Sequence, residues 1–72
     1  MPDVEEVYRS PHLADCEERV FVLLAVGVPS AIGADPDHYH VYVDGQNAGE
    51  ARAQLARYEA EQRQDAARRA AA

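Results

Sequence analysis

Residues 38–43 show the clearest alternation of apolar and polar positions in the chain. They read His-Tyr-His-Val-Tyr-Val, a run of aromatic and β-branched residues that is typical of a strand with two different faces. One face of this strand would carry Tyr39, Val41 and Val43, and the other His38, His40 and Tyr42. Two shorter strands are predicted at residues 4–9 and 28–33. Residues 34–37, Ala-Asp-Pro-Asp, have turn chemistry and predict a hairpin between the second strand and the third.

A first helix is predicted between the first two strands, with Ser10 as its N-cap, Pro11 at its first position and Gly27 as the residue that ends it. Apolar residues recur there at spacings of three and four, which indicates one inward face. The inward positions are Leu13, Cys16, Val20, Leu23 and Leu24.

A second helix follows Asp44, which suits an N-cap or a turn. Its narrow apolar face consists of Ala48, Ala51, Leu55 and Tyr58. Residues 63–72 form a basic tail rich in Ala and Arg, with high helix propensity but no apolar face, so we expect this tail to fray.

The order β-α-β-β-α predicts an α+β domain with a three-stranded antiparallel sheet. A right-handed crossover would place the strand at 38–43 in the centre and both helices on one face. The other face would remain open to water, as it often does in antiparallel sheets. We expect Leu23, Leu24, Val41 and Leu55 to be buried together. Because 72 residues support only one thin core, residues 1–62 are predicted to form the single domain.

Charge is unevenly distributed along the chain. Residues 1–50 hold ten acidic side chains and two arginines, a balance of −8. Residues 51–72 hold three acidic side chains and five arginines, a balance of +2, so the net charge is −6. An acidic body without lysine argues against nucleic-acid binding. A single cysteine and an acidic N-terminus indicate a cytoplasmic protein without a disulfide. The longest apolar run, residues 20–29, is about half the ~20 residues that span a bilayer.

No residues form a convincing catalytic or metal-binding set. Ser10 and Ser30 both lie beside prolines and outside any Gly-x-Ser-x-Gly motif, and the acidic neighbours of Cys16 would raise the pKa of its thiol. His38 and His40 could share a metal ion, but Cys16 is predicted to point into the core instead of toward them. We therefore expect no enzymatic activity, no cofactor and no metal.

Two surfaces are candidates for binding a partner. The first helix is apolar nearly all round between residues 20 and 26, which would leave Phe21 and Val22 partly exposed unless the second helix covers them. The second candidate is the open face of the central strand, with His38, His40 and Tyr42.

The motifs Cys-Glu-Glu-Arg-Val-Phe-Val-Leu-Leu-Ala-Val-Gly-Val-Pro (16–29), Val-Tyr-Val-Asp (41–44) and Ala-Arg-Ala-Gln-Leu-Ala-Arg-Tyr (51–58) carry a family resemblance. The chain resembles, over residues 4–62, the cytosolic N-terminal domain of some proteobacterial rhomboid-family intramembrane serine proteases. It is also similar to small free-standing prokaryotic domains with a signal-transducing role.

The rhomboid resemblance implies a non-catalytic domain at the cytoplasmic side of the bacterial inner membrane, with a regulatory, stabilising or interaction role. Its partner would be the transmembrane region of the parent protein, which would also hold the protease's serine and histidine. Residues 63–72 would then link the domain to that region. Arg63, Arg68 and Arg69 would supply juxtamembrane positive charge and a weak contact with lipid. The second resemblance implies a free-standing cytoplasmic binding domain.

Overall fold

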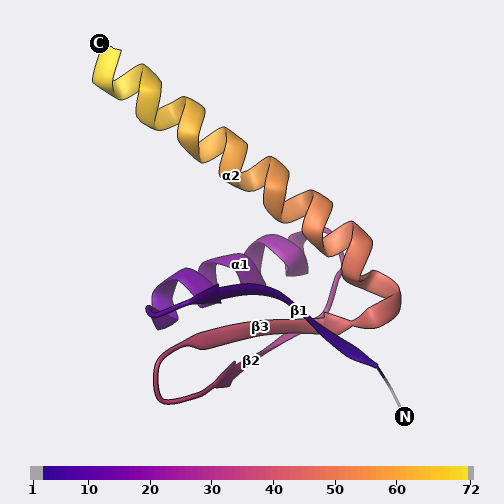
Figure 1. Ribbon diagram of the computed structural model, residues 1–72. Helices are drawn as coiled ribbons and strands as arrows, with labels where there is room; N and C mark the ends of the chain where they lie inside the picture. Colours follow the sequence, from indigo (N-terminus) through magenta and orange to yellow (C-terminus); the bar gives the residue numbers. More distant parts are fainter. Residues whose placement is uncertain (1–2, 72) are drawn as a thin grey trace.

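A computed structural model describes residues 3–71 and shows the predicted α+β fold. The elements are β1 (Val4–Ser10), α1 (Leu13–Ala25), β2 (Ser30–Ala34), β3 (Tyr39–Asp44), the 3₁₀ turn η1 (Gly45–Asn47) and α2 (Ala48–Ala71). The sheet has the order β1-β3-β2, with both neighbouring pairs antiparallel. In Figure 1, α2 crosses over the body of the molecule and then extends away from it.

The alternation along β3 separates the two faces of the sheet as predicted. Val41 and Val43 are buried against residues of both helices, which places α1 and α2 on the same side of the sheet. Cys16 and Leu23 come from α1, and the small residues Ala48 and Ala51 let α2 approach closely, with Leu55 completing the cluster. This single core is what a chain of this length can build.

A β-bulge at Val7 interrupts the pairing of β1 with β3. Glu6 lies opposite Tyr42, whereas Tyr8 lies opposite Val41, so Val7 is one residue more than the ladder accommodates. Glu6 therefore belongs to the open face of the sheet, and Tyr8 belongs to the face covered by the helices.

The start of α1 differs from the prediction. The helix begins at Leu13, and its N-cap residue is His12, not Ser10. The Ser10 hydroxyl accepts a hydrogen bond from the His12 N–H (3.0 Å) and donates one to Asp15 Oδ2 (2.7 Å). Ser10 thus closes the turn that precedes the helix, which sets Pro11 outside the first helical turn.

Two of the inward positions predicted for α1 lie at the surface. Leu24 is 62% exposed, and Leu13 is 41% exposed, whereas Leu23 is completely buried. The prediction that Leu24 belongs to the core is wrong. Successive residues on a helix are separated by about 100°, so the neighbours Leu23 and Leu24 cannot both face one thin core.

The end of α1 is a Schellman motif centred on Gly27. Gly27 has a φ of 80°, as expected of a glycine at this position, and its N–H donates to Leu24 O. The N–H of Val28 donates to Leu23 O (2.9 Å). This bond, together with the missing N–H of Pro29, explains why β2 begins at Ser30 and not at residue 28 as predicted.

The second helix is longer than its core contacts require. Asp44 caps η1 by accepting a hydrogen bond from the Gln46 N–H, and α2 then runs without a break through residue 63 to Ala71. All side chains from residue 61 to residue 71 are exposed. At 1.5 Å per residue, this exposed part is roughly 15 Å long. Figure 1 shows it extending away from the body at its yellow end. Within residues 3–71, no helix is long and apolar enough to cross a membrane.

Candidate interaction surfaces

The open face of the sheet combines charged and aromatic side chains from all three strands. The register places on it Val4, Glu6 and Arg9 from β1, Ala31 and Gly33 from β2, and His40 and Tyr42 from β3. Its centre is His40, which was predicted to be a solvent-facing aromatic residue. The His40 residue is instead only 8% exposed, because neighbouring side chains cover its ring.

Both ring nitrogens of His40 are engaged by carboxylates. Nδ1 contacts Glu6 Oε1 from β1, and Nε2 lies 2.5 Å from Asp35 Oδ2 in the β2–β3 turn. Arg9 binds the same Glu6 through an ion pair of 3.1 Å. An imidazole can donate through both nitrogens only when it is protonated, so this arrangement is that of an imidazolium between two carboxylates.

The electrostatics follow from these contacts. Hydrogen bonds to Glu6 and then to Asp35 raise the pKa of His40 above its usual 6.5. The His40 contact and the backbone N–H groups of Asp37 and His38 lower the pKa of Asp35 to about 2. Hydrogen bonds from Arg9 and His40 likewise lower the pKa of Glu6. Arg9, Glu6, His40 and Asp35 form a closed charge cluster, in which every charged group is paired with one of opposite sign. The cluster joins β1, β3 and the hairpin turn.

The same contacts make His40 a poor metal ligand or general base, since neither nitrogen has a free lone pair. The rings of His38 and His40 are 6.4 Å apart, and those of His40 and Tyr42 are 5.9 Å apart. The His38–His40 chelate considered from the sequence is thus replaced by ion pairs. Within the described residues 3–71, no group of three His, Cys, Asp or Glu side chains could hold a metal ion.

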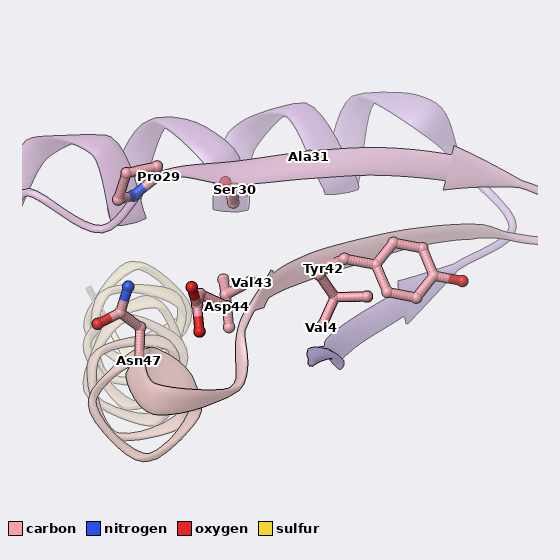
Figure 2. A pocket seen from close by; sticks show the side chains of 8 residues that line it. All are labelled: Val4, Pro29, Ser30, Ala31, Tyr42, Val43, Asp44 and Asn47. Carbon is pink, nitrogen blue, oxygen red and sulfur yellow. The ribbon is translucent and has the colours of Figure 1, made fainter. Parts of the chain in front are cut away.

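The ring of Tyr42 lies against Gly33 on the open face. A Cβ atom at position 33 would come within 2.8 Å of the Tyr42 ring, so the glycine makes room for it. Beyond the paired residues Ser30 and Val43, the two chain segments diverge and leave a shallow hollow of about 360 Å³ (Figure 2). Its lining is Val4, Pro29, Ser30, Ala31, Tyr42, Val43, Asp44 and Asn47. This hollow is open and mainly apolar, with Asp44 and Asn47 as its polar end.

The outer surface of α1 exposes the largest apolar side chain of the domain. Phe21 is 71% exposed, whereas Val22 is half-buried and packs against the core cluster. The sequence offered these two residues as one surface, and α2 accounts for the difference because it covers only one side of α1. Phe21 remains a candidate for binding, and Val22 contributes mainly to packing.

Arg19 holds α1 against β1 and α2. The sequence pattern had favoured the outward side of α1 for Arg19, together with Asp15, Glu17 and Glu18, and this prediction is wrong, since the Arg19 side chain is only 14% exposed. Its guanidinium carbon lies 4.4 Å from the centre of the Tyr8 ring and 5.3 Å from that of Tyr58. Tyr58 was predicted on the inner face of α2, but nothing in the sequence pattern paired it with Arg19. Glu6 and Asp35 were also missed as partners of His40, since pairing across strands requires the register.

The serine and cysteine side chains are buried or held by structural contacts. The Ser10 hydroxyl donates a hydrogen bond to Asp15. The buried hydroxyl oxygen of Ser30 has no hydrogen-bond partner within the described part of the chain. Cys16 is buried, and burial, followed by the nearby Asp15, raises the pKa of its thiol. A thiol in such a site is weakly nucleophilic at neutral pH.

The fold and these surfaces define a small α+β domain with a closed charge cluster on its open face and exposed apolar side chains on α1. No family model, curated protein or solved structure matches this sequence.

Proposed function

We propose that this chain is a non-catalytic domain that acts by binding a protein partner through the outer surface of α1. The observation that carries this proposal is the exposure of Phe21, a large apolar side chain, on an otherwise acidic body. Exposed aromatic residues are frequent centres of protein interfaces. The histidine of the open face supports the same choice, because its nitrogens are occupied by structural contacts.

In its specific form, the proposal is that the domain is the cytosolic N-terminal part of a rhomboid-type intramembrane serine protease, where it regulates or stabilises the parent protein. Its motifs support this assignment by resemblance. The exposed end of α2 is consistent with it, since Arg63, Arg68 and Arg69 are all solvent-exposed and positive charge is favoured on the cytoplasmic side of a membrane span. The partner of Phe21 would then be the membrane region of the parent.

The alternative is a free-standing cytoplasmic domain that binds a separate signalling partner through the same surface. The codons that follow Ala72 in the gene distinguish the two. An apolar segment of ~20 residues within about 40 codons supports the protease, and a stop codon supports the free-standing domain.

The functional test compares the full-length parent with a variant lacking residues 1–62 and with Phe21→Ser, in a cleavage assay in membranes. Val4→Ser is the matched control, because Val4 is similarly exposed but lies on β1. We expect the deletion and Phe21→Ser to change the rate or the amount of the protease, with Val4→Ser like the wild type. Unchanged cleavage and abundance in both the deletion and Phe21→Ser would disprove the proposal.

A further inference from the structure

The β2 strand leaves one edge of the sheet with unpaired backbone groups. In the described part of the chain, β2 pairs with β3 on one side and with no strand on the other. The N–H of Asp35 donates to His38 O, and hydrogen-bonded pairs of this kind alternate along an antiparallel ladder. Counted from that bond, the N–H and C=O groups of Ser30, Ile32 and Ala34 point away from β3. These groups are free to bond to an added strand.

The β2 edge also lacks the features that block such an addition. It reads Ser-Ala-Ile-Gly-Ala and pairs with β3 without a bulge. The opposite edge, β1, carries three charged side chains and is interrupted by the bulge at Val7. Because charges and bulges prevent edge-to-edge pairing in natural sheets, we expect an added strand at β2 and not at β1.

A strip on α1 lies beside this edge. Leu13, Glu17 and Leu24 are all exposed and fall within about 40° of one another around the helix axis. Arg19 lies about 120–160° from them on the same helix and contacts the ring of Tyr8 on β1. Since β1 and β2 flank β3 on opposite sides, the strip lies toward β2.

The strip and the edge match each other in length and in character. From Leu13 to Leu24 the helix rises about 16 Å, which is the length of a five-residue strand such as β2. Ile32 faces the helices and is 37% exposed, so it continues the apolar surface of α1 down to the edge. A strand added to β2 would therefore lay every second side chain against the strip.

The charges on this side of the domain indicate which kind of strand fits. Residues 10–50 hold seven acidic side chains and one arginine, Arg19, which is only 14% exposed and turned toward β1. Glu17 lies within the strip, and no ion pair involves it in the described part of the chain. A second copy of the chain would bring another Glu17 to this acidic side, whereas a basic strand would be attracted to it.

We propose that β2 accepts a fourth strand from a partner protein, an extended segment with apolar side chains and at least one Lys or Arg on the side that faces α1. The apolar side chains cover Leu13, Leu24 and the exposed part of Ile32, and the basic one pairs with Glu17. Main-chain hydrogen bonds to an edge supply affinity, and alternate side chains supply specificity. The inference rests on the proposed function, because Leu24 lies one turn from Phe21 and the same partner would cover both.

The size of the contact sets the expected affinity. A segment of about five residues buries far less than a standard interface of about 1,600 Å², so the segment alone should bind with a Kd on the order of 0.1–2 mM. Added salt should weaken this binding, because it screens the attraction between opposite charges.

The experiment titrates the isotope-labelled 72-residue chain with the peptide acetyl-Ser-Val-Thr-Lys-Thr-Val-Ser-amide, up to about 5 mM, while backbone amide chemical shifts are recorded. One matched peptide has Glu in place of Lys. A second is methylated on the backbone nitrogens of Thr-Lys-Thr, so it keeps its side chains but loses three N–H groups. Glu17→Lys reverses the charge of the strip, and Glu61→Lys, on the exposed end of α2, makes the same change as a control. Unchanged circular dichroism verifies that both variants are folded.

We expect saturable shifts at residues 30–34 and along the side of α1 that carries Leu13 and Leu24. The Glu peptide and the methylated peptide should bind at least about threefold more weakly than the Lys peptide. Glu17→Lys should prefer the Glu peptide, and Glu61→Lys should keep the wild-type order.

The absence of saturable shifts up to about 5 mM, or equal binding of all three peptides, overturns the proposal. So do shifts at residues 30–34 that depend on the protein concentration alone, which would assign the edge to a second copy. Glu17→Lys is also compared with Phe21→Ser in the cleavage assay of the parent. An effect of Phe21→Ser without one of Glu17→Lys would leave the proposed function standing and overturn the strand addition.

Discussion

The imidazole of His40 and the carboxylate of Asp35 lie 2.5 Å apart although one belongs to the central strand and the other to the hairpin turn. The turn is fixed from within as well, because the other oxygen of Asp35 accepts hydrogen bonds from the N–H groups of Asp37 and His38. Protonation of one ring is thereby coupled to the conformation of a whole hairpin.

The first prediction is a stability maximum at mildly acidic pH. The pKa of His40 is raised in the folded state, so its contribution is fully present below 6.5 and is lost as the pH rises through the folded-state value. The pKa values of Glu6 and Asp35 are lowered, so their contribution is present above about 4.5 and is lost as the pH falls toward their folded-state values, about 2 for Asp35. Between these limits all three groups are charged.

Urea unfolding at about pH 5.5, 7 and 8.5 tests this pH dependence. The unfolding midpoint should decrease across the series in the wild type and change much less in His40→Gln. His38→Gln is the matched control, and its unfolding midpoint should decrease with pH as much as that of the wild type. The prediction would be contradicted if the unfolding midpoint of His40→Gln decreased with pH as much as that of the wild type.

The second prediction separates two adjacent leucines. Leu23→Ala removes a completely buried side chain and should lower the free energy of unfolding by about 2–5 kcal/mol. Leu24→Ala removes a mostly exposed side chain and should cost less than about 1 kcal/mol. Denaturant titration of both variants at low protein concentration measures the difference. Equal losses would mean that α1 is rotated relative to the structure.

The third prediction is that replacing Gly27 and Gly49 by alanine has different effects on stability. Gly27 has a positive φ at the end of α1, so Gly27→Ala should destabilise the domain by about 1–2 kcal/mol. Gly49 lies in the first turn of α2 with open space around it, so Gly49→Ala should be neutral or stabilising by up to about 1 kcal/mol. Thermal unfolding should move the two midpoints in opposite directions or leave that of Gly49→Ala unchanged.

The fourth prediction tests the stacking of Arg19. Arg19→Lys keeps the charge but replaces the planar group that lies over Tyr8 and Tyr58, and it should cost about 0.5–2 kcal/mol. Arg57→Lys, on the exposed side of α2, is the control and should have little effect. Near-ultraviolet circular dichroism should report altered tyrosine packing only in Arg19→Lys.

The fifth prediction is that residues 63–71 add helix but do not stabilise the domain, which deletion of residues 63–72 tests. Their described side chains make no core contact, so deleting them should reduce helical circular dichroism and change the free energy of unfolding by less than about 0.5 kcal/mol. Weak, salt-sensitive binding to anionic vesicles should disappear with them, because Arg63, Arg68 and Arg69 contribute about 1 kcal/mol each. Equal, salt-insensitive binding of both forms would assign lipid contact to the folded body.

The sequence predicted the order of elements, the central place of β3 and the end of α1, since each depends on local signals such as alternation and a glycine. It misplaced Leu24 because the wide apolar stripe of α1 does not reveal which side a thin core uses. It missed the Glu6–His40–Asp35 cluster for a different reason. His40 lies 34 positions after Glu6, and only the strand register, including the bulge, brings the two together.

The extra residue at Val7 changes the phase of β1 halfway along its length. In an uninterrupted strand, Glu6 and Tyr8 would point the same way. With the shift, Glu6 and Arg9 meet on one face, while Tyr8 and Ser10 serve the other, where they contact Arg19 and Asp15. The bulge therefore lets β1 place Glu6 and Arg9 on the open face and Tyr8 and Ser10 on the face covered by the helices. Deleting Val7 would turn the side chains of one half of the strand to the wrong face.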